Sequence, residues 1–335
     1  MTLTVPAEWS PHRAMWLGFP SHAELWQDDL APAQAEVAAF ARALTGPGRE
    51  RVRLMVCGDD AMAAARALLG GVAGVELQAG VFGDIWLRDT GPIFVKEDGM
   101  AKTAGFRFNG WGGKYMLEGD ETVAGQIAAA AGAPLVMNDF VLEGGALDHD
   151  GQGTILTTRQ CLLNPNRNPS MDQAGLERAL HAALGARKIL WLDDGLAGDH
   201  TDGHVDNLAR FVAPGVVACP VAYGADDPNA EVYDAAARAL AAMADISGAR
   251  LKLMRIPSPG RILDEDGEPM AASHMNFLIA NGAVIAPTYD DEGASNFALG
   301  ALRSLFPDRE VIGLPARALL TGGGSFHCIT QQEPA

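Results

Sequence analysis

The sequence has no apolar run long enough to span a lipid bilayer. The longest such stretches, for example residues 75–81 and 282–287, are far shorter than the roughly 20 residues that a transmembrane helix needs. The N-terminus also lacks a basic region followed by an apolar block, the pattern of a secretory leader. We therefore expect a globular protein of the cytoplasm and no membrane partner.

Basic residues are also few. The sequence has 25 Lys and Arg against 42 Asp and Glu, which gives a formal net charge of −17. Nucleic acids and anionic membrane surfaces are bound by clustered Lys and Arg, so we expect neither as a partner. The acidic charge favours cationic ligands only weakly, because it also serves solubility.

Cysteines are scarce and widely spaced. There are four, Cys57, Cys161, Cys219 and Cys328, with no C-x-x-C pair, which argues against a zinc knuckle, a redox motif and a disulfide framework. The first three lie in the apolar segments RVRLMVC, RQCLL and GVVACPV, which predict buried strands where cysteine acts as a small hydrophobe. Cys328 differs, because it follows TGGGSFH in a Gly-rich, polar context.

The chain has no low-complexity linker that would mark a domain boundary. Gly and Pro are spread as turn residues, and 48% hydrophobic content in 335 residues is enough for a large core. We therefore predict a single domain over residues 1–335.

An Ala-rich amphipathic segment followed by a β-branched strand recurs along the chain. Most of these segments begin at or near Asp or Asn, which are residues that cap helix N-termini. The predicted helices are residues 32–44, 120–131, 172–184, 229–246 and 291–306. The strands that follow them are RVRLMVC, APLVM, ARKILWL, ARLKLMRI and REVIGL. An extra helix over residues 60–69 lies outside this pattern.

Apolar stretches bounded by Gly lie between these units. GTILTTRQCLL, NLARFVAPGVVACPV and MNFLIANGAVIAP each predict two short strands joined by a turn. The repeating unit is therefore close to β-β-α-β. Five such units closing in a ring predict an α/β propeller whose inward strand edges converge on one central site.

Five short segments place acids, His or Cys beside Gly or apolar residues, which is unusual for a solvated surface. Taken singly, each has an ordinary structural interpretation: Asp89 could pair with Arg88 or cap a turn, and Glu143 could bond the backbone of a turn. The segments are DIWLRDTGP from Asp84, FNGWGGKY from Phe108, LEGG from Leu142, DGHVDN from Asp202 and GGGSFHC from Gly322.

His200, His204 and Asp206 also form a possible zinc ligand set. Gly203 argues against the continuous helix that would bring both histidines onto one face. The TGGG run is a poor phosphate cradle, because no Lys follows it and no helix pattern opens after it. We therefore predict no metal.

Taken together, the segments resemble the agmatine deiminase, or peptidylarginine-deiminase-like, branch of the guanidine-modifying (pentein) superfamily. The resemblance covers essentially the whole chain. In order, it includes EWSPHRAMWLGFP from Glu8, DIWLRDTGP, FNGWGGKY, EGG, LNPNRNP from Leu163, DGHVDN, NFLIANG and GGGSFHCITQQ. It implies the pentein fold, an α/β propeller of five β-β-α-β repeats around a pseudo-fivefold axis, no cofactor and a homodimer.

The resemblance also implies an activity and the residues that perform it. The activity is a hydrolase reaction on linear amidines within putrescine and polyamine biosynthesis. The implied roles are nucleophile for Cys328, general acid and base for His204, orientation of His204 for Glu143, and guanidinium binding for Asp89 and Asp206. Four further residues are expected at the substrate: Trp86, Trp111, His200 and Gly323.

These residue types suit deimination. A guanidinium is a poor electrophile that becomes worse without its proton, so paired carboxylates must keep it cationic. A nearby cation, either His204 or the substrate, lowers a cysteine pKa from about 8.5 and so provides the attacking thiolate. His204 can protonate the departing ammonia and activate the water that hydrolyses the Cys328 thiouronium. We predict that agmatine is converted to N-carbamoylputrescine and ammonia.

The sequence departs from the family pattern at two positions. His200 stands where an acidic residue is usual, and His274 where an aromatic residue is usual. If these positions hold the far end of the substrate, a different guanidine is an open alternative: arginine, peptidyl arginine or a guanidino acid. Such substrates would need an arginine for their carboxylate, and the candidates are Arg107, Arg167 and Arg261. A metal-dependent hydrolase and a non-catalytic binding propeller also stay open.

Overall fold

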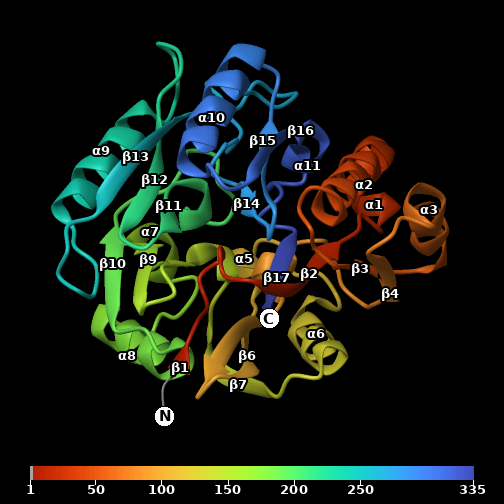
Figure 1. Ribbon diagram of the computed structural model, residues 1–335, viewed down its shortest axis with the longest axis horizontal. Coiled ribbons are helices and arrows are strands. Elements are labelled where there is room, and N and C mark those ends of the chain that lie inside the picture. Colours follow the sequence, from red (N-terminus) through yellow and green to blue (C-terminus); the bar gives the residue numbers. More distant parts are fainter. Residues whose placement is uncertain (1–2) are drawn as a thin grey trace.

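The computed structural model describes residues 3–335, which form five separate β-sheets that lie around the middle of the molecule (Figure 1). None of the sheets closes on itself within these residues. Every sheet contains at least one antiparallel and one parallel strand pair. A parallel pair requires a crossover connection, and helices supply it. The protein is therefore an α/β protein.

Three sheets have three strands each. In all three, the first two strands in sequence are antiparallel and the last two are parallel. The strands are β8 (Asp148–His149), β9 (Thr154–Thr158) and β10 (Lys188–Leu192); β11 (Arg210–Ala213), β12 (Val216–Val221) and β13 (Lys252–Pro257); and β14 (Leu278–Ile279), β15 (Ala283–Thr288) and β16 (Glu310–Pro315). The β-β-α-β order predicted from the sequence is present in each.

The other two sheets have four strands and tie the ends of the chain into the fold. Their strands are β1 (Leu3–Thr4), β5 (Ile93–Glu97), β6 (Met100–Arg107) and β7 (Leu135–Val141), and β17 (Thr330–Pro334), β2 (His12–Gly18), β3 (Val52–Val56) and β4 (Val75–Ala79). The last strand, β17, pairs antiparallel with β2. The segment just before β17, which carries Cys328, is thereby anchored to the N-terminal part of the chain.

Long helices lie at the periphery and make the crossovers (Figure 1). They are α2 (Leu30–Thr45), α3 (Asp59–Leu69), α6 (Val123–Ala131), α8 (Gln173–Leu184), α9 (Ala230–Ala242) and α10 (Glu292–Leu305). Short helical turns lie between the sheets: α1 (Ala23–Trp26), η1 (Gln27–Asp29), α4 (Leu87–Thr90), α5 (Gly110–Gly113), η2 (Asp120–Thr122), η3 (Gly144–Ala146), α7 (Arg159–Leu162), η4 (Val205–Asn207) and α11 (Arg317–Thr321).

The predicted helices are confirmed, with changes at their ends. Residues 120–131 divide into η2 and α6, and α9 ends at Ala242 instead of residue 246. The side chains of Asp172 and Asp291 cap α8 and α10 as predicted. Asn229 does not cap α9, because its Oδ1 accepts a hydrogen bond from the backbone of Ala197 at 2.7 Å.

One predicted strand pair is wrong. GTILTTRQCLL forms β9 followed by the helical turn α7, because Thr158 Oγ1 caps this turn by accepting from the backbone N–H of Cys161 at 3.3 Å. Cys161 is therefore on a helix. Cys57 follows β3 and is only partly buried, whereas Cys219 is fully buried on β12 as predicted. All four cysteines are free.

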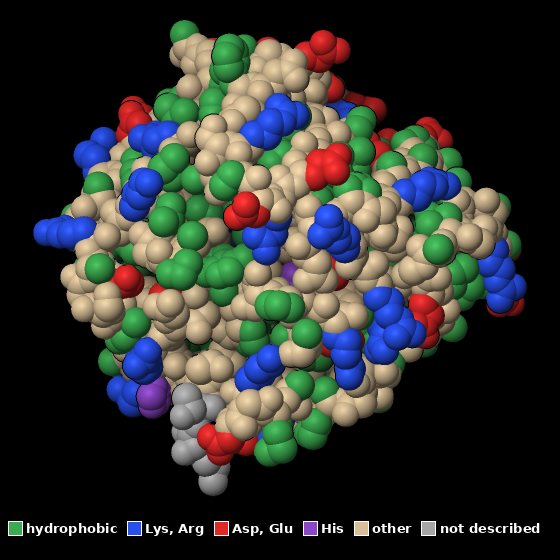
Figure 2. All heavy atoms as spheres, viewed as in Figure 1, with side chains coloured by type: hydrophobic (Ala, Val, Ile, Leu, Met, Phe, Trp, Pro, Cys, Tyr) green, Lys and Arg blue, Asp and Glu red, His purple; other side chains and the backbone are tan. Residues whose placement is uncertain are grey.

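Across residues 3–335, no helix has both the length and the apolar character needed to cross a membrane. Figure 2 shows one face of the molecule, on which Lys and Arg side chains are interspersed with acidic and hydrophobic ones. A continuous basic surface of the kind that binds nucleic acid is not seen on this face.

Arg210 is a fully buried cation that links distant parts of the chain. Its guanidinium donates to Asp148 and to Glu8, both at 2.6 Å. It also donates to the backbone carbonyls of Met275 and Phe277, at 3.2 and 3.0 Å. Burial opposes the charge, yet Glu8 and Asp148 raise the pKa of Arg210 above its ordinary value. The N-terminal loop, β8, β11 and the segment before β14 are thus held by one side chain.

We expect Arg210→Met to lower the free energy of unfolding by about 3–5 kcal/mol, because it leaves two buried carboxylates without their cation. Arg107→Met is the control. Arg107 lies 3.2 Å from Asp139, but both side chains are exposed, and such a pair contributes at most about 1 kcal/mol. Urea unfolding followed by circular dichroism measures both changes. Equal losses in the two variants would contradict the assigned role of Arg210.

Candidate active site

The five predicted catalytic residues come together in the structure, and all are at most 5% exposed. The Nδ1 atom of His204 lies 3.7 Å from Asp89 Oδ1, and Cys328 Sγ lies 3.6 Å from Asp206 Oδ2. A carboxylate oxygen of Glu143 lies within 4.8 Å of a ring nitrogen of His204. The turns α4, η3 and η4 and the segment before β17 supply these residues.

Gly145 explains why the motif requires a glycine after Glu143-Gly144. A Cβ at Gly145 would lie 2.5 Å from His204 Nδ1, 2.9 Å from Asp89 Oδ1 and 3.1 Å from Asp206 Oδ2. Its backbone N–H donates to Asp89 Oδ1 at 2.9 Å. Any side chain here would separate the residues that the site brings together.

Asp89 is held by two donors. Besides the bond from Gly145, it accepts one from Trp111 Nε1, at 3.0 Å from its Oδ2. Trp111 has a left-handed backbone conformation, with φ of 52°, within the FNGWGG turn. Burial raises the pKa of Asp89 to about 6, although the nearby His204 acts in the opposite direction. The predicted substrate residue Trp111 therefore orients a carboxylate of the site.

Asp206 is oriented by a histidine that the sequence analysis did not single out. His327 Nδ1 lies 2.8 Å from Asp206 Oδ2, and its Nε2 lies 2.9 Å from Glu8 Oε2. The imidazole of His327 therefore links the carboxylate of Asp206 to that of Glu8. Burial alone would raise the pKa of Asp206, but His327 and His204 hold it below its ordinary value.

Asn276 holds the sulfur of Cys328. Its Nδ2 donates to Sγ at 3.1 Å, and its Oδ1 accepts from the backbone N–H groups of His327 and Cys328 at 2.9 and 3.3 Å. This residue was also missed, although the NFLIANG motif begins with it. Burial, with Asp206 and Asp89 nearby, raises the pKa of Cys328 well above its ordinary value. The thiol is therefore protonated when the site is empty.

Glu143 is tied to the loop that precedes His204. Its Oε1 accepts from Arg167 Nε at 2.6 Å, and Arg167 also donates to Asp202 at 2.7 Å and to the carbonyl of Thr201 at 2.8 Å. Burial would lower the pKa of His204, but the carboxylates facing it, Asp89 above all, raise it well above its ordinary value. His204 therefore carries a proton at neutral pH.

The Gly-rich segment before Cys328 packs directly on Trp86. A Cβ at Gly324 would lie 2.5 Å from the Trp86 ring. The indole is fixed by Asp84, whose two oxygens accept from Trp86 Nε1 at 2.7 Å and from Trp26 Nε1 at 3.0 Å. Gly323, which directly precedes Gly324 in this segment, has a φ of 105°. Trp86 and the Gly-rich segment thus form one wall beside the nucleophile.

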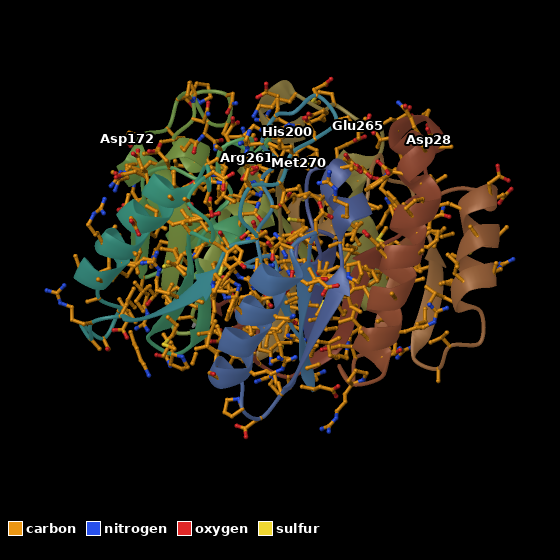
Figure 3. All side chains as sticks on the ribbon, turned by 90° about the horizontal axis from the view of Figure 1, so that it is seen from above. Asp28, Asp172, His200, Arg261, Glu265 and Met270 are labelled. Carbon is orange, nitrogen blue, oxygen red and sulfur yellow. The ribbon has the colours of Figure 1, made fainter. Side chains whose placement is uncertain are left out.

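His200 lies outside the buried group. It is exposed, its Nδ1 is 2.8 Å from the hydroxyl of Tyr115, and its carbonyl accepts from Lys114 Nζ at 2.7 Å. In the view of Figure 3 it lies near the upper edge of the molecule. The zinc set of His200, His204 and Asp206 considered from the sequence is therefore wrong, since His200 stands apart. Among residues 3–335, the group within metal-ligand distance is Glu143, Cys161 and His204.

His274, the second departure from the family pattern, is buried against Tyr289, with ring centroids 5.7 Å apart. Its Nδ1 lies 2.9 Å from the carbonyl of Pro257, and its Nε2 has no hydrogen-bond partner. Burial lowers the pKa of His274 to about 4. The ring is therefore neutral, with Nδ1 as donor and Nε2 as a free acceptor.

Comparison with known proteins agrees with this geometry. The family model of the Porphyromonas-type peptidyl-arginine deiminases matches residues 4–334. An agmatine deiminase of Pseudomonas aeruginosa is 39% identical over 99% of this chain and 95% of its own. The solved structure of an Enterococcus faecalis agmatine deiminase superposes with a TM-score of 0.92 at 33% identity, covering 99% of this chain and 96% of the other.

A C. jejuni agmatine deiminase with substrate bound gives a TM-score of 0.90 at 28% identity, covering 99% of this chain and 96% of the other. These similarities extend over nearly the whole chain. The chain belongs to the Porphyromonas-type peptidyl-arginine deiminase family.

Proposed function

We propose that the protein is an agmatine deiminase, which hydrolyses agmatine to N-carbamoylputrescine and ammonia through a covalent intermediate on Cys328. The observation that carries this proposal is the buried thiol of Cys328 beside two carboxylates, with Asp206 Oδ2 at 3.6 Å. Such an arrangement suits a cationic substrate that brings its own positive charge to the thiol. The full-length agmatine deiminase relatives support the same activity.

The five sheets support a matching proposal for the fold. The strand pairing within each sheet and the position of the sheets around the centre fit a pseudo-fivefold propeller, with residues 1–335 forming one catalytic domain. The site lies where turns from several sheets meet. A homodimer in the cytoplasm belongs to the same proposal and is supported by the family alone.

The guanidinium is held by Asp89 and Asp206. Asp206 Oδ1 is buried and has no hydrogen-bond partner, so it is free to accept from a substrate N–H. Burial without a partner is costly for such an oxygen, which favours binding of a cation with several N–H donors. Trp86 and Gly323 border the site, and the aliphatic part of the substrate lies against the Trp86 ring.

The bound cation activates the thiol. In the free protein Asp206 and Asp89 disfavour a thiolate, and a guanidinium placed between them and Cys328 reverses that effect. Asn276, which donates to Sγ at 3.1 Å, stabilises the thiolate that forms. The thiolate then attacks the guanidinium carbon and gives a tetrahedral adduct.

His204 completes both halves of the reaction. It donates its proton to the departing ammonia, and the neutral imidazole then takes a proton from the water that hydrolyses the thiouronium. Glu143 lies close enough to orient the ring. The product is a neutral urea, so Asp89 and Asp206 lose their cationic partner and release it.

Agmatine is favoured over arginine because the arginines that could receive a carboxylate already face acids. Arg107, Arg167 and Arg261 each lie within 4.0 Å of an Asp or Glu oxygen. Neutral His274 offers a free acceptor at Nε2, which suits an ammonium and not a carboxylate. Both observations favour a substrate that ends in a cation.

Cys328→Ser should abolish ammonia release from agmatine while leaving the fold intact, because the hydroxyl is a far weaker nucleophile than the thiolate. Cys161→Ser and Cys219→Ser should retain turnover. An ammonia-release assay, with circular dichroism as the folding check, measures all three variants. Near-normal turnover by Cys328→Ser would overturn the mechanism.

Asp89→Asn and Asp206→Asn should each lose about 3–5 kcal/mol of transition-state stabilisation, measured from kcat/KM for agmatine. The same variants should react faster with the neutral reagent iodoacetamide when substrate is absent. Each carboxylate raises the pKa of Cys328, so its removal lowers this pKa and increases the thiolate fraction at a given pH.

The pH dependence of the alkylation rate shows in which direction the carboxylates shift the pKa of Cys328. In the unmodified protein the alkylation rate should still rise with pH above 9.0, since the pKa of Cys328 lies well above that value. In the Asp variants the rise should shift to lower pH. Asp139→Asn, at an exposed position, is the control and should change neither rate. Slower alkylation in the Asp89 and Asp206 variants would show that these carboxylates do not act on the thiol.

Agmatine should have the highest kcat/KM among simple guanidines, ahead of arginine and of an acidic guanidine. The reason is the distal group, which is an ammonium in agmatine and includes a carboxylate in the others. Side-by-side kinetics on purified protein measure this preference. A preference for a carboxylate-bearing guanidine that His200→Glu reverses toward agmatine would refute the assignment and identify His200 as the residue responsible.

A further inference from the structure

Cys161 differs from the other two cysteines outside the nucleophile position, because it lies in the buried centre next to polar groups. Its sulfur, a ring nitrogen of His204 and a carboxylate oxygen of Glu143 all lie within 4.8 Å of one another. All three residues are fully buried. The mechanism proposed above uses Glu143 and His204 and has no role for this thiol.

The atoms that face this space lack partners. Glu143 Oε2 and both ring nitrogens of His204 are buried without a partner at normal hydrogen-bond distance, although buried polar atoms are almost always paired. The imidazole faces Asp89, whose Oδ1 lies 3.7 Å from Nδ1, and the thiol of Cys161. The other oxygen of Glu143 accepts from Arg167 at 2.6 Å. That bond fixes the carboxylate in the way that outer partners orient metal ligands.

We propose that Glu143, Cys161 and His204 form an inhibitory site for a thiophilic divalent cation, of which Zn²⁺ is the type. One nitrogen, one sulfur and one oxygen match the ligands that Zn²⁺ takes in tetrahedral sites. Three protein ligands leave the fourth position for water. This is a different site from the set with His200 that the sequence suggested.

Charge balance permits such a cation in a buried place. A thiolate and the Glu143 carboxylate supply two negative charges against the two positive charges of the cation, and the Arg167 guanidinium that bonds Glu143 is also paired with Asp202, which limits the cost of burial. Burial raises the pKa of the Cys161 thiol, but a coordinating metal deprotonates a thiol outright and the proton leaves to solvent. The imidazolium of His204 must likewise lose a proton to solvent, and the bound cation then occupies the freed lone pair of His204 and an oxygen of Glu143. Inhibition therefore rests on the proposed function, whereas binding rests on the geometry alone.

Co²⁺ binding tests the site without any substrate. In Cys328→Ser protein, where the nucleophile cannot contribute sulfur, added Co²⁺ should give a thiolate-to-cobalt absorption band at one metal per chain. The band should vanish when Cys161→Ser is added and should persist when Cys219→Ser is added instead. Cys219 is the matched control, because it is equally buried, on β12, but is not part of the group within metal-ligand distance among the described residues. Circular dichroism verifies that each variant is folded, and Cys161→Ala replaces Cys161→Ser if the latter is not.

Zn²⁺ inhibition tests the consequence. Each variant is assayed on agmatine with Zn²⁺, and its rate is divided by its own rate with chelator. Cys161→Ser should raise the Zn²⁺ concentration for half-inhibition by at least about tenfold, since loss of even an outer-shell group typically costs 10–100-fold in metal affinity. Cys219→Ser should leave it unchanged.

Two results would overturn the proposal: no thiolate-to-cobalt band in Cys328→Ser, or a band that persists after Cys161 is replaced. Zn²⁺ inhibition that is unchanged in Cys161→Ser would place the cation on Cys328 instead. Failure of the protein to hydrolyse agmatine would count against the proposed function only, because the cobalt band is measured without turnover.

Discussion

A buried chain of alternating charges is the interaction on which the site depends. Arg210 donates to Glu8 at 2.6 Å, Glu8 faces His327 at 2.9 Å, and His327 faces Asp206 at 2.8 Å. Isolated charges in a protein interior are expensive, and each one here is compensated by the next. Because His327 immediately precedes Cys328, the chain also sets the nucleophile beside Asp206. The contacts that stabilise the fold are therefore also the contacts that arrange the site.

The charges at the Asp206 end of this chain are not fully compensated, and this incomplete compensation favours binding of a cation. Asp206 keeps one buried oxygen without a partner, and burial raises the pKa of Asp89 to about 6. The thiol of Cys328 stays protonated in the same field. In the proposed mechanism a guanidinium removes all three penalties at once, since it would pair with the carboxylates and stabilise a thiolate. Differential stabilisation of this kind ties reactivity to binding of the correct charge.

The residues that perform chemistry could be predicted from the sequence because their motifs are short and local. Asp89, Glu143, His204, Asp206 and Cys328 all lie in the predicted segments and meet in the structure. Most helices could be predicted as well, because amphipathic periodicity is a local property. The wrong strand at GTILTTRQCLL has a local cause too, since a single threonine cap converted it into a helical turn.

The supporting residues could not be predicted in this way. Glu8 and His327 are 319 positions apart, and Asn276 and Cys328 are 52 apart. No periodicity or composition signals such pairs, because they exist only after the sheets have been arranged. The same reason explains Cys161, which has an apolar sequence context and packs in an apolar cluster, yet also lies next to Glu143 and His204. Short-range patterns identify reactive groups, whereas long-range packing decides their partners.

Two glycines show how a short-range sequence motif contributes to long-range packing. At Gly145 and Gly324 a Cβ would come within 2.5 Å of His204 Nδ1 and of the Trp86 ring, respectively. The close approach lets backbone and side chains of separate turns share one small, buried volume. Donors fixed in such a buried, close-packed site need little rearrangement when charge develops on the substrate. The Gly-rich motifs are therefore part of the electrostatics of the site, because they set how near its charges can stand.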